Sequence, residues 1–128
     1  MPPENGILII DETGFSRICS AILEREGYVT KAATTRHALV SALSSDDVGL
    51  AIISYPFGAF FCGEIKKKRI PALILSDHIN RDLIDLLEGF EDSYSCCMIK
   101  PLDYRKFRRV VKEVITDETA VHAGYSIV

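Results

Sequence analysis

The feature that most constrains this chain is an unbroken run of small and aliphatic residues at positions 49–53. Because the run has no polar alternation, it predicts a β-strand buried on both faces, as in the middle of a parallel sheet covered by helices. The run ends at Ser54 and is followed by Pro56 and Gly58, which predict a loop. In open parallel sheets, ligands bind beyond the carboxyl ends of the strands. Ser54 is therefore expected at the place where a reactive group of this chain would lie.

Segments with helical spacing separate this strand from four further apolar runs. These runs lie at residues 7–10, 28–32, 70–75 and 96–99. The helical segments have apolar residues at the i, i+3, i+4, i+7 spacing of an amphipathic helix, and Asn80 and Asp103 are expected N-caps. Five strands alternating with five helices predict a doubly wound α/β domain with right-handed crossovers. The pattern dissolves after residue 116, so residues 1–116 are interpreted as the domain and residues 117–128 as a tail or linker.

Composition and charge limit the classes of protein to which this chain can belong. The 128 residues are 48% hydrophobic and carry a net charge of −3, which is typical of a soluble globular domain with no general attraction to nucleic acid or anionic membranes. No apolar run approaches the roughly 20 residues that cross a bilayer. No signal peptide is expected, because the first residues lack a basic and an apolar segment. The cysteines lack metal-ligand spacing and are interpreted as reduced thiols of a cytoplasmic protein: Cys19, Cys62, Cys96 and Cys97.

Polar residues stand at the carboxyl ends of four predicted strands. Asp11 and Glu12 follow the first strand, Ser54 ends the third, Ser76 follows the fourth and Lys100 follows the fifth. Since the carboxyl ends of parallel strands meet at one edge of the sheet, these side chains are expected to share a pocket. Hydrophobic periodicity alone does not require polar residues at these ends. Their convergence therefore indicates a functional site.

Four motifs, in this order, resemble the receiver domain of two-component response regulators over residues 6–116. They are Ile-Leu-Ile-Ile-Asp-Glu at 7–12, Leu-Ala-Ile-Ile-Ser at 50–54, Ala-Leu-Ile-Leu-Ser at 72–76 and Met-Ile-Lys-Pro-Leu at 98–102. The resemblance implies a flavodoxin-like sheet of five parallel strands in the order 2-1-3-4-5. In that family, an acidic pair after the first strand and an aspartate ending the third strand hold Mg²⁺. A histidine kinase phosphorylates that aspartate.

Carried over by position, the resemblance puts Ser54 in the place of the phosphoacceptor aspartate. Ser76 matches the hydroxyl residue, and Lys100 the lysine, that contact the phosphoryl oxygens in the family; Pro101 matches the proline that follows. A serine hydroxyl is neutral, so it forms no acyl phosphate and it removes one charge from the metal site. We therefore expect no catalytic residue and no cofactor.

The identity of the acidic pair is open. Read directly after the strand, the pair is Asp11 and Glu12, whereas counting back from Gly27 makes Ile10 and Asp11 the two positions. No metal is expected once the aspartate is missing, and weak Mg²⁺ binding by Asp11 and Glu12 is the alternative. Lys100 has no phosphoryl group to contact, so it is expected to form an ion pair with one of these acids.

The sequence therefore predicts a degenerate receiver, or pseudoreceiver, in two-component or phosphorelay signalling. It is not expected to be an enzyme. It would contact a kinase, an output domain or another receiver, including a second copy of itself. The position of the family's aromatic switch residue, three before the lysine, holds Cys97. The resemblance implies a contact face on the fourth helix, fifth strand and fifth helix, with the outward residues Arg81, Asp85, Glu88, Tyr104, Arg105 and Arg108.

Two other functions fit the same fold. A receiver-like domain could instead sense a small ligand in the pocket that the aspartate vacates. A hydrolase or transferase on a flavodoxin-like fold is the enzyme alternative. The sequence argues against that enzyme, because it has no Gly-rich phosphate loop, nucleophile elbow or metal-binding cluster.

Overall fold

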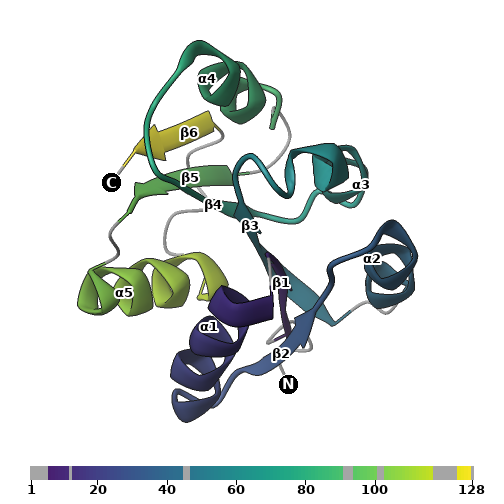
Figure 1. Cartoon of the computed structure of the whole chain (residues 1–128). Helices are drawn as coiled ribbons and strands as arrows, with labels where there is room; N and C mark the ends of the chain where they lie inside the picture. The colour runs from purple at the N-terminus through teal and green to yellow at the C-terminus, as the bar shows by residue number, and fades with distance from the viewer. Residues whose placement is uncertain are drawn as a thin grey trace.

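Six parallel strands form one sheet in the computed structural model of the chain (Figure 1). The structure describes residues 6–11, 13–44, 47–90, 94–100, 103–116 and 124–127. Among these residues, no helix is both long enough and apolar enough to cross a lipid bilayer. The elements are β1 (Gly6–Ile10), α1 (Thr13–Arg25), β2 (Val29–Ala32), α2 (Arg36–Leu43), β3 (Val48–Ser54), η1 (Ala59–Phe61), α3 (Cys62–Lys67), β4 (Ala72–Ser76), α4 (Arg81–Glu88), β5 (Tyr94–Ile99), α5 (Tyr104–Ile115) and β6 (Gly124–Ile127).

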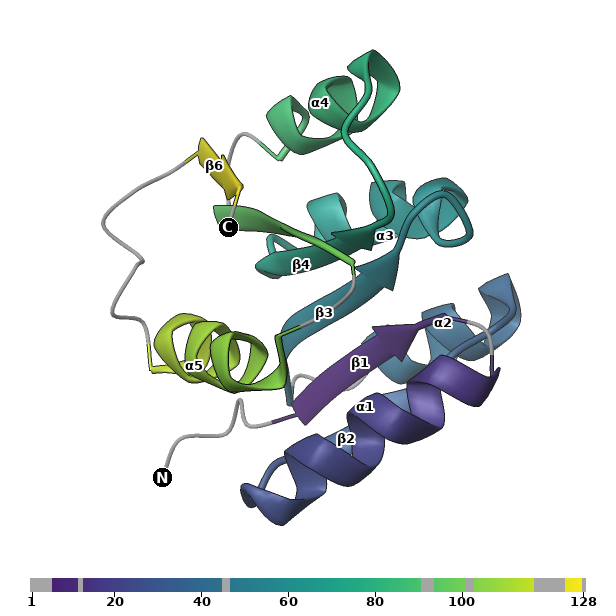
Figure 2. The same ribbon diagram turned by 60° about the vertical axis from the view of Figure 1, so that its left-hand side comes forward.

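Helices cover both faces of the sheet. Figures 1 and 2 show α1 and α5 on one face and α2, α3 and α4 on the other. Strand alternation divides the core accordingly: in β3, Leu50 and Ile52 pack with α1 and α5, and Ala51 and Ile53 pack with the other helices. All four side chains are buried. The run without polar alternation is thus buried on both faces, as predicted.

The order of the five predicted strands is confirmed. β1 lies between β2 and β3, and β4 and β5 follow on the far side of β3. The register pairs Ile9 with Ile52 and Ile10 with Ile53 across β1 and β3. Every neighbouring pair is parallel, so each connection has to cross a face of the sheet, and the helices serve as these crossovers.

A sixth strand occupies part of the segment that the sequence predicted to be a tail or linker. β6 runs parallel to β5, with Tyr94 opposite Gly124 and Cys97 opposite Ile127, and it lies beside α4 (Figures 1 and 2). A short edge strand is held by backbone hydrogen bonds to a single neighbour, so its sequence needs no apolar pattern. For that reason hydrophobic periodicity did not predict it.

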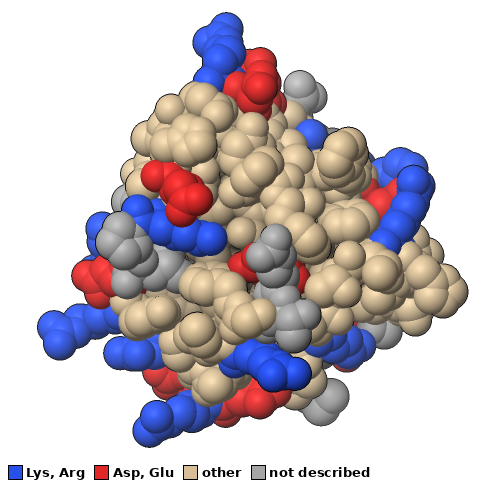
Figure 3. Space-filling model, viewed as in Figure 1, with Lys and Arg blue, Asp and Glu red and all other residues tan. Residues whose placement is uncertain are grey.

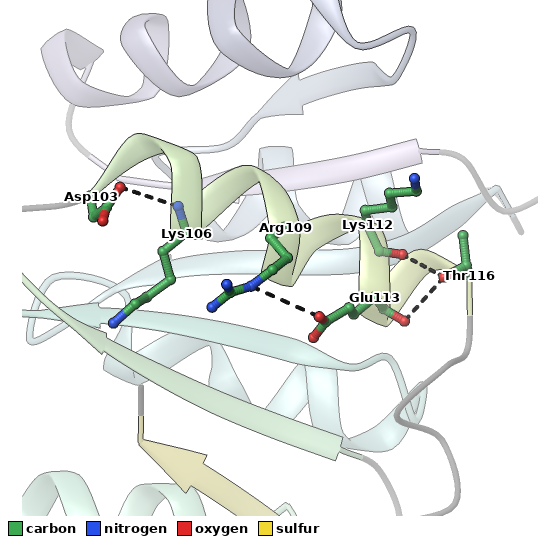
Figure 4. A network of polar contacts seen from close by, with 6 residues as sticks. All are labelled: Asp103, Lys106, Arg109, Lys112, Glu113 and Thr116. Carbon is green, nitrogen blue, oxygen red and sulfur yellow. Dashed lines mark hydrogen bonds and ion pairs between the residues drawn. The ribbon is translucent and has the colours of Figure 1, made fainter.

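Side chains cap two helices at the predicted positions. At the start of α4, Asn80 Oδ1 accepts a hydrogen bond from the backbone N–H of Leu83 at 2.8 Å. At the start of α5, Asp103 Oδ1 accepts hydrogen bonds from the backbone N–H groups of Arg105 and Lys106, at 3.0 and 3.2 Å; Figure 4 draws the second. The bond from Lys106 is the main cause that holds the pKa of Asp103 below its ordinary value. The carboxylate therefore stays charged as a cap.

We expect Asn80→Ala to lower the free energy of unfolding by about 1 kcal/mol, because the N–H of Leu83 loses its acceptor at the start of α4. Urea unfolding followed by circular dichroism measures the change. Asn80→Asp keeps a side-chain acceptor and is the control, with an expected change below about 0.5 kcal/mol. An equal loss in both variants would show that the cap does not stabilise α4.

Candidate functional site

The predicted pocket residues line up along the carboxyl edge of the sheet. The register pairs Ser54 of β3 with Leu75 of β4, and Ser76 with Ile99 of β5. Asp11 comes one residue after the Ile10–Ile53 pair, which places it beside Ser54. Asp11, Ser54 and Ser76 are all buried. All three residues therefore lie at the same edge of the sheet.

Strand alternation sorts these residues between the two faces. Asp11 continues the side of β1 that packs with α1 and α5, Ser54 continues the same side of β3, and Lys100 the same side of β5. Ser76 follows the opposite side of β4, which packs with α2, α3 and α4. Asp11, Ser54 and Lys100 thus form the group on the α1 and α5 face, and Ser76 lies apart from it.

The placement of Ile10 bears on which residues form the acidic pair. Ile10 is fully buried in the core under α2, α3 and α4, on the face opposite Asp11. Its Cγ2 lies only 3.1 Å from the point where a Cβ on Gly58 would stand. The side chain of Ile10 therefore packs in the core rather than beside Asp11. This favours Asp11 with Glu12 as the pair, although Glu12 itself lies outside the described residues.

Lys100 does not form the predicted ion pair with Asp11. Among the residues that the structure describes, its Nζ lies over the ring of Phe15 in α1, 4.8 Å from the ring centroid. The negative face of an aromatic ring attracts an ammonium group, so Phe15 is one partner of Lys100. Glu12, the other acid of the prediction, lies outside the described residues. Burial is the main cause that raises the pKa of the Cys19 thiol in α1 to about 12. The charge of Asp11 raises this pKa further, and the charge of Lys100 lowers it. Asp11 and Lys100 therefore share one electrostatic environment without touching.

The loop after Ser54 folds back onto the end of the strand. The N–H of Gly58 donates to the carbonyl oxygen of Ser54 at 2.6 Å, and the Tyr55–Pro56 peptide bond is cis. A Cβ at position 58 would lie 2.5 Å from Cγ2 of Ile53, so this close return requires glycine. Ser54 thus lies where β3 ends and the following loop folds back onto the strand.

Among the described residues, no histidine forms a hydrogen bond with the Ser54 hydroxyl group. A nucleophilic serine needs a base within hydrogen-bond reach of its hydroxyl group. The histidine that follows β4 is His78, and its ring contacts Asn80 Nδ2 at 3.1 Å. The Ser76 hydroxyl group is also engaged, since it donates to the carbonyl oxygen of His78 at 2.7 Å. The geometry gives no support to a serine nucleophile.

The donors at this edge do not fit a Mg²⁺ site as far as they are described. Mg²⁺ prefers several hard anionic oxygens in near-octahedral geometry. The described residues supply one buried carboxylate, Asp11, and the neutral hydroxyl of Ser54, whereas Asp77 after β4 is exposed. No group of three His, Cys, Asp or Glu side chains that could hold a metal ion occurs in the described part of the chain.

The switch position is filled by a small buried side chain. Cys97 is fully buried and packs in the core with α2, α3 and α4. Burial, and to a lesser extent Cys96, raises the pKa of its thiol to about 11. Position 97, which the resemblance matches to the aromatic switch residue, therefore holds a buried core residue. Pro101 lies outside the described residues.

The side chains of the predicted contact face are exposed, but they do not all share one surface. On α4, Arg81 Nε lies 3.6 Å from Asp85 Oδ1, and Glu88 is also exposed. On α5, Tyr104, Arg105 and Arg108 are exposed. Arg108 is the exception, because its Nε lies 3.5 Å from Glu26 Oε1 and it therefore faces the end of α1 rather than α4. The predicted face also included β5, but β6 pairs with the edge of β5.

We expect Cys19, Cys62 and Cys97 to resist iodoacetamide in the native protein at about pH 8, because thiolates react and burial raises their pKa values to about 12, 11 and 11. The unfolded thiols ionise near 9.0, so the unfolded state binds fewer protons above that pH and stability should fall as pH rises from about 9 toward 11. Mass spectrometry counts the adducts, with urea-unfolded protein as the positive control. Rapid labelling of the native protein would contradict this burial.

Comparison with known proteins identifies the fold. No protein-family model and no curated protein sequence matches the chain. A response regulator receiver domain protein (CheY-like) from Methanospirillum hungatei JF-1 matches with a TM-score of 0.77 at 19% identity, covering 91% of this chain and 97% of that one. A two-component response regulator from Clostridium difficile matches with 0.76 at 18%, covering 90% and 98%. The beryllofluoride-activated NtrC4 receiver domain dimer matches with 0.70 at 19%, covering 88% and 98%.

The likeness extends over nearly the whole of each matched structure, so it concerns a complete domain rather than a shared motif. At these identities the likeness establishes the fold and leaves the chemistry to the residues of this chain. The chain has the flavodoxin-like fold of CheY-like receiver domains, with a serine at the end of its central strand.

Proposed function

We propose that this chain is a degenerate receiver domain, or pseudoreceiver, in two-component or phosphorelay signalling, and that it acts through contacts with other proteins. Ser54 carries this proposal. It is a buried serine at the end of the central strand, in a chain that has the fold of receiver domains. In receivers, an aspartate at that strand end accepts the phosphoryl group. A hydroxyl group cannot form the acyl phosphate that this chemistry requires.

The side chains that would hold a phosphoryl group are also committed to other contacts. The hydroxyl of Ser76 donates to the carbonyl oxygen of His78, and the ammonium group of Lys100 lies over the ring of Phe15. Neither contact requires an anion at Ser54. Ser76 and Lys100 are therefore engaged by groups of the chain itself, which supports a domain that does not depend on phosphorylation.

Charge on two helices supports a protein partner. α4 has three carboxylates and one arginine, and α5 has five basic residues and one glutamate. Surfaces of opposite charge steer association and fix orientation, so an acidic helix of one molecule can lie against the basic helix of another. The NtrC4 receiver is a dimer. We extend this to the present chain, with a second copy, a kinase or an output domain as the partner.

The proposed contact face is α4, β6 and α5, because β6 covers the edge of β5. Its exposed side chains include Arg81, Asp85, Glu88, Tyr104 and Arg105. On the face shown in Figure 3, Lys and Arg lie around the margin without forming a continuous basic patch. That distribution favours a protein over nucleic acid as the partner. The proposed setting is the cytoplasm, where the four buried cysteines would stay reduced.

The small-ligand alternative receives less support. The clefts found among the described residues are lined by Tyr28, Val48, Pro71 and Ile115, which lie toward the amino edge of the sheet. Ser54 ends β3 at the carboxyl edge. None of these clefts is the pocket that the missing aspartate would vacate.

Incubation with acetyl phosphate and Mg²⁺ should leave the intact mass of the protein unchanged, because Ser54 has neither a carboxylate nor a base. Ser54→Asp restores a carboxylate beside Asp11, and the two anions should repel each other without metal. We therefore expect the variant to melt at a higher temperature in Mg²⁺ than in EDTA, because the metal binds only the folded state. Thermal unfolding in both buffers measures this difference.

Ser54→Asn is the matched control, since it has nearly the shape of aspartate without its charge and should melt equally in both buffers. Equal melting of Ser54→Asp in both buffers would mean that the site has lost more than its aspartate. A stoichiometric phosphoryl adduct on an aspartate of the unsubstituted protein would overturn the pseudoreceiver proposal.

A further inference from the structure

A cleft of about 570 Å³ opens at the edge of the sheet opposite Ser54. It lies between the last turn of α1, the start of β2 and the second half of α5. Tyr28 precedes β2 and Ile115 ends α5, so the cleft belongs to the amino edge of the sheet. It is therefore separate from the site around Ser54, and the proposed function makes no use of it.

Three cations from two neighbouring turns of α5 line the cleft. They are Arg108, Arg109 and Lys112, and among the described residues of the lining only Glu26 has a carboxylate. This surplus of positive charge stands out in a chain whose net charge is −3. A local field of this sign attracts anions to the cleft, and its low-dielectric walls strengthen the attraction.

The ion pairs that these cations already form are long and solvent-exposed. Arg108 Nε lies 3.5 Å from Glu26 Oε1, and Arg109 Nε lies 3.9 Å from Glu113 Oε1. Lys112 forms no ion pair with any residue that the structure describes, and Figure 4 shows its side chain extending away from Arg109 and Glu113. Exposed pairs of this kind contribute little to stability, so exchanging them for a phosphate costs little.

The floor of the cleft is apolar. It is formed by Tyr28 and Ile115, which are partly exposed, with the buried Leu23 beneath them. Burial, and then the charge of Glu26, raises the pKa of the Tyr28 hydroxyl, so this group stays protonated and can donate a hydrogen bond. An aromatic ring of a ligand can pack against Tyr28 while its anionic group reaches the cations of α5.

We propose that this cleft binds a nucleoside phosphate or a closely similar organic phosphate of mononucleotide size. The volume lies within the roughly 300–1,000 Å³ of small-molecule sites. The lining has the two parts that such a ligand needs, an apolar floor for a ring and a wall of cations for phosphate oxygens. A simple inorganic anion would use the wall but gain nothing from the floor, so the two parts together select the ligand class.

The competing interpretation is that Arg108, Arg109 and Lys112 are only the solvated face of an amphipathic helix, and a binding experiment separates the two. Isothermal titration calorimetry of the full chain with ADP, GDP, CDP and UDP is compared with pyrophosphate and adenosine. We expect at least one diphosphate to bind with a Kd below about 1 mM, about tenfold tighter than pyrophosphate or adenosine.

The double variant Arg109→Gln, Lys112→Gln should weaken that binding by about tenfold or more. The control is Lys67→Gln, Lys68→Gln, which removes the same charge from the exposed end of α3 and should leave binding unchanged. Thermal unfolding of both variants checks that the fold is retained. Lack of binding by all four diphosphates, equal binding of pyrophosphate, or equal weakening in both variants would each overturn the proposal.

Discussion

Burial of the central strand on both faces is the constraint on which the rest of the structure depends. Neither face of β3 reaches water, because Leu50 and Ile52 pack under α1 and α5 while Ala51 and Ile53 pack under the other helices. A strand of this kind must be flanked by parallel neighbours and covered by crossover helices. Its alternation then fixes which way Ser54 projects at the carboxyl edge. The position of the candidate site is thus a consequence of packing in the core.

The chemistry of the edge is set by single side chains on that fixed scaffold. Replacing one carboxylate by the hydroxyl of Ser54 removes both the acceptor of an acyl phosphate and one charge from a metal site. The surroundings match this change, since Lys100 packs over Phe15 and Cys97 occupies the switch position in the core. The pocket therefore lies on a receiver-like scaffold and combines a serine, a lysine packed on an aromatic ring and a buried cysteine. This combination is the physical reason for expecting a contact module.

The fold could be predicted from the sequence because buried strands and helices have recognisable patterns of apolar residues. The features that were missed have no such pattern. The four inner strands, edge strand β2, the order of these five and the caps Asn80 and Asp103 follow from apolar runs and local hydrogen-bond chemistry. β6 could not be predicted, because an edge strand needs only backbone partners. The contact of Lys100 with Phe15 could not be predicted either, since it depends on how α1 lies over the sheet.

In helix α5, removal of surface charge is expected to change binding affinity more than the free energy of folding. Four buried residues, Phe107, Val110, Val111 and Val114, fix the helix against the sheet. Burial of side chains of this size contributes about 1.5–3 kcal/mol each, whereas an exposed ion pair contributes about 1 kcal/mol or less. The cations of α5 are therefore held in place by a core in which they take no part. Because the fold does not need them, a change in affinity on their removal can be assigned to the surface that they form.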